Sequence, residues 1–244
     1  MLNNMNDLEN YFRNNTGRLI HKWNHYFDIY EKHFSRFKNK KPVILEIGVS
    51  HGGSLQMWKK YFGPEAQIFG VDIDPRCKKF EEENIKIFIG SQSDRNFLRE
   101  LKKILPKIDI LIDDGGHTMK QQITTFEELF DHIRKNGVYL CEDCHTSYKR
   151  NFGGGYKKRG SFIEYTKNWI DLLNAFLSSD KRLQPNELTK NIKSIHYYPS
   201  IVVVEKGEMI KPTDSKTGIP SWNDINQDIS LLHKIISKFQ NLTK

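Results

Sequence analysis

The chain has 244 residues, of which 37% are hydrophobic and 28% are charged, as in a globular protein with one good-sized core and little room for a second domain. No apolar run approaches the length of a membrane span, and the N-terminus MLNNMNDLENYF lacks the layout of a signal peptide, so we expect a cytoplasmic protein without a membrane partner. The net charge of +8 suits either a solvated basic surface or an anionic partner, with nucleic acid disfavoured because no binding motif accompanies the charge.

Apolar runs of strand length alternate with segments of helical pattern along most of the chain. Residues 19–37 carry aromatic side chains three and four positions apart, which predicts an amphipathic helix. The five runs that follow are residues 43–49, 67–74, 85–90, 108–114 and 137–143. Segments of helical pattern lie between them, at residues 54–62, in a short charged stretch after 74, at 94–105 with Asp94 as N-cap, and at 119–135. Continuous apolar strands alternating with helices indicate a parallel sheet that is covered on both faces.

The C-terminal third continues this α/β pattern with fewer strands. Residues 161–177 begin with a capping box, Ser161 to Glu164, and predict a helix. Residues 192–207 predict two strands in a hairpin, and residues 221–239 predict a last amphipathic helix. We therefore expect an N-terminal helical extension (residues 1–40), an α/β core (41–207) and a C-terminal helical extension (208–244).

The first two strands end in residues that suit an adenosine-bearing ligand. In such sheets the ligand binds at the carboxyl ends of the strands. The turn LEIGVSHGGSL carries Glu46, Gly48 and Ser54, with glycines that allow close approach of a ligand but without the spacing of the dinucleotide fingerprint. Asp72 ends the second strand, where a carboxylate can accept hydrogen bonds from ribose hydroxyls. The alternative is that Asp72 caps a helix or holds a loop.

Four acids end the fourth and fifth strands. Asp113 and Asp114 precede His117 by four and three positions, and Glu142 and Asp143 end the next strand. Carboxylates that share a cleft repel one another unless a cation relieves them, and an oxygen-only set suits Mg²⁺. His117 is then the group that accepts a proton at neutral pH. The alternative, in which the acids cap helices and His117 lies in a surface turn, suits one acid better than four.

The stretch CEDCH (residues 141–145) matches the attachment signature of a c-type haem. That chemistry requires export and an exposed segment, whereas Cys141 continues an apolar strand. Three cysteines also argue against a disulfide framework, and neither the cysteines nor His117 has zinc-ligand spacing. Cys141 is therefore expected in the core, and Cys144 in a pocket or loop.

Five segments in order resemble one family. KW-HYF-IYEKHF, VILEIGVSHGGSLQMW, GVDIDP, IDDGGHT and EDCHTSYKRNFGGG resemble the metal-dependent sugar O-methyltransferases of the mycinamicin and macrocin type, within the class I S-adenosylmethionine-dependent methyltransferases. The resemblance runs from about residue 19 to residue 155, with a weaker echo in IHYYPSIVVVEK. It implies a Rossmann-like, seven-stranded, mostly parallel sheet whose last strand is antiparallel, within a methyltransferase core at residues 41–207.

The resemblance also implies roles for single residues. The Mg²⁺ ligands that it implies are Asp114, Glu142 and Asp143, with His117 as general base beside Asp114 at the catalytic centre. The S-adenosylmethionine-binding residues are Glu46, Gly48, Ser54, Asp72, Gln92 and Asp113. The block after the third strand departs from the common pattern at Ser91, and His145 replaces a common aromatic residue. The adenine contact of Gln92 and the identity of the substrate are therefore the least determined assignments.

As a hypothesis, Mg²⁺ chelates two vicinal hydroxyls of a small-molecule sugar, free, nucleotide-linked or part of a natural product, and His117 removes the proton of the hydroxyl that is methylated. Alternatives are a non-sugar acceptor (RNA, a phosphoramidate or a small phenol) and a non-catalytic nucleotide-binding module. The basic segment Lys157–Arg159 is either a lid over an acceptor phosphate or a solvated loop. The aromatic stripe at 19–37 packs in the core or against another subunit of an expected homo-oligomer, and the resemblance places Lys22, His25 and Tyr26 as candidates to close over the site.

Overall fold

The computed structural model describes residues 5–221, and every structural statement below concerns this part of the chain. The chain divides after Lys211 into two units. All helices and strands given below belong to the first unit, and residues 212–221 of the second carry neither. The helix predicted at residues 221–239 lies almost wholly outside the described residues, so the C-terminal extension stays a prediction.

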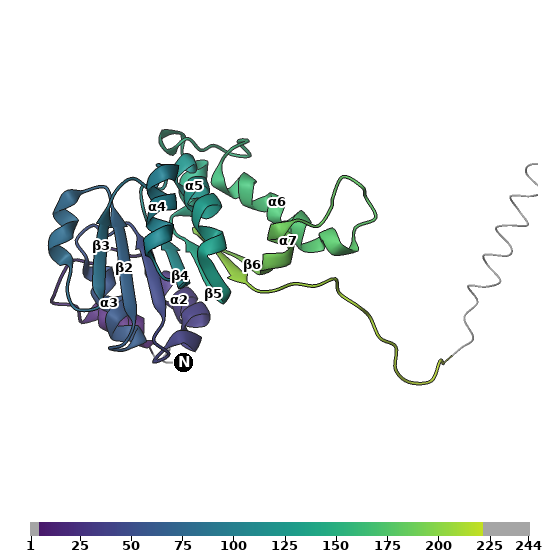
Figure 1. Cartoon of the computed structure of the whole chain (residues 1–244), viewed down its shortest axis with the longest axis horizontal. Coiled ribbons are helices and arrows are strands. Elements are labelled where there is room, and N and C mark those ends of the chain that lie inside the picture. Colours follow the sequence, from purple (N-terminus) through teal and green to yellow (C-terminus); the bar gives the residue numbers. More distant parts are fainter. Residues whose placement is uncertain (1–4, 222–244) are drawn as a thin grey trace, which may run out of the picture. The chain divides into compact units, whose positions relative to one another are not determined.

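Seven strands form one sheet in the order β3-β2-β1-β4-β5-β7-β6 (Figure 1). The strands are β1 (Val43–Ile47), β2 (Gln67–Asp72), β3 (Ile85–Ile89), β4 (Ile108–Asp113), β5 (Ile133–Cys141), β6 (Ile192–Tyr198) and β7 (Ile201–Lys206). The first five are parallel, and β7 is antiparallel to both β5 and β6, its hairpin partner. The predicted sheet, with its antiparallel last strand, is confirmed.

The helices after β1, β3 and β4 follow the predicted alternation, and the short charged stretch after β2 forms a 3-10 helix (Pro75–Phe80). The α-helices are α1 (Asp7–Arg13), α2 (Tyr26–Phe34), α3 (Gly53–Phe62), α4 (Arg95–Ile104), α5 (Met119–Leu129), α6 (Phe162–Asn174) and α7 (Glu187–Asn191). Asp94 is the N-cap of α4, as predicted, because its carboxylate accepts the backbone N–H groups of Asn96 and Phe97. Among the described residues, no helix combines the length and the apolar character that a membrane crossing requires.

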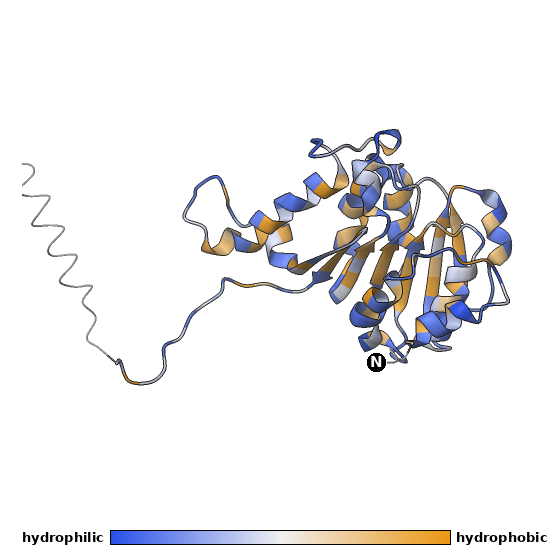
Figure 2. Cartoon of the chain, turned by 180° about the vertical axis from the view of Figure 1, so that it is seen from behind, coloured by the Kyte–Doolittle hydropathy of each residue, from blue (hydrophilic) through white to orange (hydrophobic). Residues whose placement is uncertain are grey.

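Two apolar layers hold the sheet between its helices. Side chains of α1, α2 and α3 pack on one face, against strand residues such as Ile44, Ile112 and Val203. Side chains of α4, α5 and α6 pack on the other, against residues such as Leu45 and Leu111. Figure 2 shows the result as mostly apolar strands inside helices that turn polar faces outward. Both faces of the parallel strands are therefore dry, which leaves the carboxyl edge of the sheet as the place for polar chemistry.

The predicted helix at residues 19–37 is wrong in its first third. Helix α2 begins at Tyr26, and residues 19–25 form no helix, with Leu19 and Trp23 more than half exposed. The cause is tertiary: residues 15–25 run across the carboxyl edge of the sheet, where polar groups hold them. The stripe of α2 itself packs in the core of this chain, since Tyr26, Phe27, Tyr30 and Phe34 are each at most 1% exposed. The homo-oligomer stays a prediction.

Candidate active site

The site begins where the loops after β1 and β4 touch. Gly48 has φ +97°, and a β-carbon there would lie 2.0 Å from the backbone oxygen of Asp114. Only glycine fits both the left-handed backbone and this close approach. On the two sides of this contact lie two pockets of about 260 and 280 Å³, which share Gly48, Ser50, Asp114 and Gly115 as lining residues. The two pockets therefore adjoin each other.

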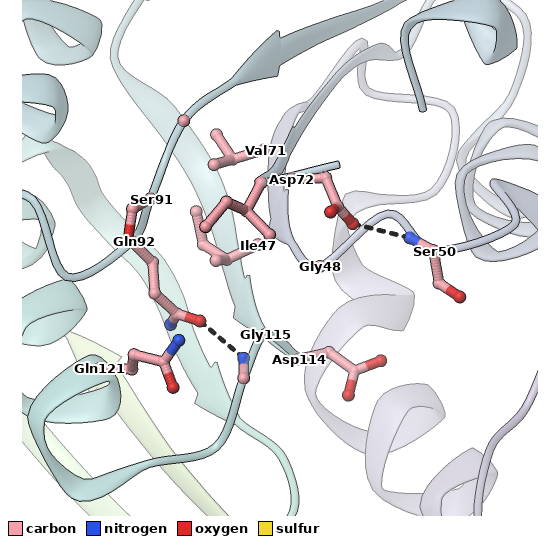
Figure 3. A pocket seen from close by; sticks show the side chains of 13 residues that line it. Ile47, Gly48, Ser50, Val71, Asp72, Ser91, Gln92, Asp114, Gly115 and Gln121 are labelled. Carbon is pink, nitrogen blue, oxygen red and sulfur yellow. Dashed lines mark hydrogen bonds between the residues drawn. The ribbon is translucent and has the colours of Figure 1, made fainter. Parts of the chain in front are cut away.

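The first pocket lies over the ends of β1, β2 and β4 (Figure 3). Asp72 lines it, and its Oδ2 accepts the backbone N–H groups of Val49 and Ser50 at 2.8 and 2.9 Å. The carboxylate thus holds the loop after β1, as the alternative hypothesis for Asp72 stated, and also borders the pocket. Gln92 lines the pocket from the β3 side and accepts the backbone N–H of Gly116 at 2.7 Å. Both side chains fix the pocket wall through backbone amides.

Two of the predicted cofactor residues lie behind this wall. Asp113 is fully buried and accepts a hydrogen bond from Gln92 Nε2 at 2.9 Å, and its burial raises the pKa of its carboxyl to about 6. Glu46 is also fully buried and accepts one hydrogen bond from Ser54 Oγ at 2.8 Å. Neither acid lines the two pockets, whereas Gly48, Asp72 and Gln92 line the first and Ser54 lines the second. Asp113 and Glu46 thus hold Gln92 and Ser54, the side chains that line the pockets.

The second pocket brings together Asp114, His117 and Asp143. His117 Nε2 lies 3.4 Å from Asp143 Oδ2 and 3.8 Å from Asp114 Oδ1, and these three side chains have ligand atoms within 4.8 Å of one another. His117 and Asp143 both have the left-handed backbone, with φ +56° and +52°. Non-glycine residues rarely adopt it, and such strain concentrates at functional sites.

Asp143 is held from the other side by aromatic donors. Its Oδ1 accepts Trp23 Nε1 at 3.0 Å and the Tyr26 hydroxyl at 2.8 Å, which leaves Oδ2 facing His117. Asp114 has the same division, because its Oδ2 accepts Lys22 Nζ at 2.5 Å while Oδ1 faces His117. Each carboxylate therefore directs one oxygen into the pocket.

Glu142 lies apart from this group, although it was predicted with Asp114 and Asp143 as a metal ligand. Its carboxylate is 1% exposed and accepts the Tyr30 hydroxyl at 2.7 Å and Lys22 Nζ at 2.9 Å. Burial and the nearby charge of Asp114 raise the pKa of Glu142, and Lys22 opposes that rise. In the described structure Glu142 is thus satisfied by a lysine and a tyrosine.

Lys22 is the cation of the site. From the sequence it was a candidate to close over the site and was not placed among the metal or cofactor ligands. Its Nζ contacts Asp114 and Glu142 and lies 3.6 Å from Glu46 Oε1. Burial alone would lower the pKa of Lys22, but these three carboxylates raise it well above its usual range, so the ammonium stays charged. The family block pointed to Lys22 and Tyr26. The only sequence signal for Tyr30 was a hydroxyl inside an apolar stripe, which needs a partner when buried.

The donor set fits a hard divalent ion. Asp114 Oδ1 and Asp143 Oδ2 are carboxylate oxygens without another hydrogen-bond partner among the described residues, and both side chains remain about one-fifth exposed. Mg²⁺ is commonly bound by one or two carboxylates and keeps several waters. The stretch CEDCH does not fit haem attachment, because Cys141 is fully buried in β5 and Cys144 is 2% exposed. Cys141 lies in the core and Cys144 borders a pocket, as predicted.

The seven-stranded sheet, in this order and with helices on both faces, has the Rossmann-like fold of the class I methyltransferases. Residues 45–144 match a family described as a methyltransferase domain.

The resemblance to the sugar O-methyltransferases is confirmed by similar proteins. The chain is 35% identical over 204 residues to mycinamicin VI 2''-O-methyltransferase of Micromonospora griseorubida, covering 79% of this chain and 49% of that protein. It is 34% identical over 218 residues to demethylmacrocin O-methyltransferase of Streptomyces fradiae, covering 84% and 53%. The solved structure of MycE methyltransferase from the mycinamycin pathway with Mg and SAH matches with a TM-score of 0.73 at 32% identity, covering 92% and 59%. The chain spans about half the length of the curated relatives it matches.

Proposed function

We propose that this protein is an S-adenosylmethionine- and Mg²⁺-dependent O-methyltransferase that methylates a sugar hydroxyl. One observation carries the proposal: two carboxylate oxygens and His117 Nε2 converge in a pocket that shares its wall with the glycine-lined pocket beside it. The names of the relatives, both O-methyltransferases, and the Mg and SAH of the MycE structure agree with it.

The first pocket takes the cofactor. The loop after β1 offers glycine and backbone, and Asp72 borders the pocket where a ribose can present its hydroxyls. Gln92 lines the adenine side, and Gly48 borders both pockets. The activated methyl group then lies near Asp114 and His117. Catalysis mainly requires that the acceptor oxygen be positioned and deprotonated.

Asp114 and Asp143 hold the metal ion through the oxygens that face the pocket, with Glu142 as the third ligand expected from the sequence. When bound, Mg²⁺ lowers the pKa of a coordinated sugar hydroxyl. Tyr26, on α2, keeps Asp143 in place for this task.

His117 accepts the acceptor proton on Nε2. The hydrogen bond from Thr146 Oγ1 to its carbonyl oxygen at 2.8 Å holds the left-handed backbone from which the ring enters the pocket. The neighbouring charges of Asp114 and Asp143 stabilise the imidazolium that forms.

A third pocket, of about 440 Å³, supports an acceptor larger than a free sugar. Tyr148, Tyr197 and Tyr198 line it, and His145 and Ser200 connect it to the acids, since His145 Nδ1 lies 3.8 Å from Asp143 Oδ1. Aromatic walls suit a flat or apolar group attached to the sugar. The acceptor is thus proposed to be a sugar joined to a flat or apolar group.

Incubation with S-adenosylmethionine, Mg²⁺ and a panel of free sugars, nucleotide-linked sugars and glycosides with apolar aglycones tests the proposal. We expect a mass gain of one methyl group on a glycoside, lost after exhaustive chelation and restored by Mg²⁺. Turnover that survives chelation would remove the metal from the mechanism, and failure to bind S-adenosylmethionine by calorimetry would overturn the enzyme itself.

His117→Ala separates the base from a metal ligand. Loss of a general base lowers kcat by about 10²- to 10⁴-fold and leaves the affinities for S-adenosylmethionine and Mg²⁺ nearly unchanged. If Mg²⁺ affinity falls with kcat, His117 is a ligand, and if activity is unchanged the base is another group.

A further inference from the structure

Residues 15–25, here called the strap, cross the carboxyl edge of the sheet in front of the second pocket. At one end Arg18 donates to the backbone oxygen of Phe80 at 3.0 Å, and at the other His25 Nε2 lies 2.9 Å from the backbone oxygen of Pro199. Between these two ends the strap packs closely against the start of α3, where a β-carbon at Gly53 would lie 2.4 Å from the backbone oxygen of Leu19. Leu19, Ile20, His21 and Lys22 line the second pocket. The strap is therefore one wall of the proposed methyl-transfer site.

Lys22 fastens this wall to the acids. Its side chain is 2% exposed, and its ammonium donates to Asp114 Oδ2 and to both oxygens of Glu142 within 3.0 Å. Glu142, the third acid expected to hold Mg²⁺, thus has both oxygens bound to a cation that belongs to the chain, whereas Asp114 keeps Oδ1 free of it. A carboxylate oxygen that accepts a short charged hydrogen bond from an ammonium is not free to ligate a metal ion at the same time.

We propose that Lys22 competes with the divalent metal ion for Glu142, whose two oxygens both accept its ammonium, so that metal binding releases Lys22 and loosens the strap. This inference rests on the proposed function, because it takes the metal to bind at Glu142. A metal that must first displace the ammonium binds with an apparent affinity lowered by the fraction of molecules in which this carboxylate is open. Between metal-binding events, Lys22 keeps the buried carboxylates paired, because a buried charge without a partner is strongly destabilising.

The proposal makes Lys22 a positioning residue with two functions. In the metal-free protein it holds the acids apart from solvent and closes the second pocket. In the metal-bound protein its release opens the wall formed by Leu19–Lys22, through which the acceptor can enter. Metal binding would then precede acceptor binding.

Calorimetry with Mg²⁺ alone, and counting of free Mn²⁺ by electron paramagnetic resonance, test the competition without any substrate. Lys22→Met should bind either ion more tightly than the wild-type protein, on the order of tenfold or more, because both the competitor and a like charge are removed. Lys120→Met is the matched control, since Lys120 is an exposed lysine at the start of α5, and its affinity should equal the wild-type value. Equal or weaker binding by Lys22→Met overturns the inference and leaves the proposed function standing. No binding by either protein overturns both.

Trypsin tests the release in the wild-type protein and does not depend on the folding of a variant. Cleavage after Lys22 requires its side chain to enter the protease, which its burial prevents in the described state. Mg²⁺ should therefore accelerate cleavage between Lys22 and Trp23, measured by mass spectrometry, whereas cleavage after the exposed Arg182 should keep its rate. Slower or unchanged cleavage after Lys22 at saturating Mg²⁺ overturns the release of the strap.

Discussion

Two halves of the carboxyl edge are built in different ways. In the cofactor half, at the ends of β1 to β3, the contacts are local: Asp72 and the Val49 amide are 23 residues apart, and Ser54 and Glu46 are eight apart. In the acid half, at the ends of β4 and β5, Lys22 and Glu142 are 120 residues apart. The first half is thus formed by two neighbouring strand-to-loop segments, and the second depends on an N-terminal segment that must dock on it.

The two halves also differ in charge. The cofactor half gives its acids hydrogen bonds from backbone amides and a hydroxyl, which are neutral donors, and only Glu46 among them also lies near a charge, 3.6 Å from Lys22 Nζ. The acid half gathers Asp114, Glu142 and Asp143 around a lysine and two tyrosines. A lost neutral hydrogen bond costs about 1 kcal/mol, whereas a buried charge without its partner costs about 3–5 kcal/mol. Substitutions should therefore separate the halves by the size and the kind of their effect.

Asp143→Asn should have the largest effect on activity, and it should affect the acid half alone. The asparagine oxygen can still accept from Trp23 and Tyr26, but an NH2 group, which cannot ligate a metal ion, replaces the oxygen that faces His117. We expect kcat/KM to fall about a thousandfold or more, as metal ligation is lost. Calorimetry should show lost Mg²⁺ binding and unchanged S-adenosylmethionine binding.

Asp131→Asn is the control for this change, because Asp131 is an exposed carboxylate that pairs with Lys102 on the surface. It should leave both affinities and the rate at their wild-type values. An equal loss of S-adenosylmethionine affinity in Asp143→Asn would show that the two halves are not separable.

Gly48→Ala should damage both halves, because Gly48 lies where they touch. The added methyl group meets the backbone oxygen of Asp114 at 2.0 Å, and φ +97° strains any side chain. We expect about 3 to 4 kcal/mol of lost stability in urea unfolding, with weakened binding of both ligands. Gly160→Ala tests the backbone part alone, since Gly160 has φ +83° and no atom within 4 Å of the added carbon. Equal losses of stability in the two variants would mean that the backbone of Asp114 moves away from the added methyl group at little cost in free energy.

The different construction explains what the sequence could predict. Strand ends follow from apolar runs, and parallel strands place their carboxyl ends on one edge, so the positions of Asp72, Asp114 and Asp143 could be predicted with the sheet. The glycine turn follows from local spacing as well. Each of these inferences requires only the alternation of strands and helices.

The partners of the acids could not be predicted in the same way. The periodicity of residues 19–37 continues through Trp23, so it predicts a helix where the chain instead crosses the sheet edge to bring Lys22 to Glu142. Periodicity indicates which apolar side chains are buried. Lys22 is buried because three carboxylates from distant parts of the chain bind its ammonium, and periodicity carries no information about such contacts. The engagement of Glu142 by Tyr30 has the same origin.

The docking of α2 on the sheet gives the smallest of the three expected effects and a dependence on pH. Burial alone would raise the pKa of Glu205 on β7, but hydrogen bonds from His33 and Arg36 lower it to about 2. Since the folded pKa lies below the ordinary value of 4.5, this stabilisation is fully present above about pH 4.5 and is lost as the pH falls toward 2. At neutral pH, Glu205→Gln should cost about 2–3 kcal/mol in urea unfolding, and its stability should vary less than that of the wild-type protein between these two pH values. Because α2 also carries Tyr26 and Tyr30, the same variant should lower the affinity for Mg²⁺ more than the affinity for S-adenosylmethionine. A larger loss of S-adenosylmethionine affinity would show that α2 does not organise the acid half.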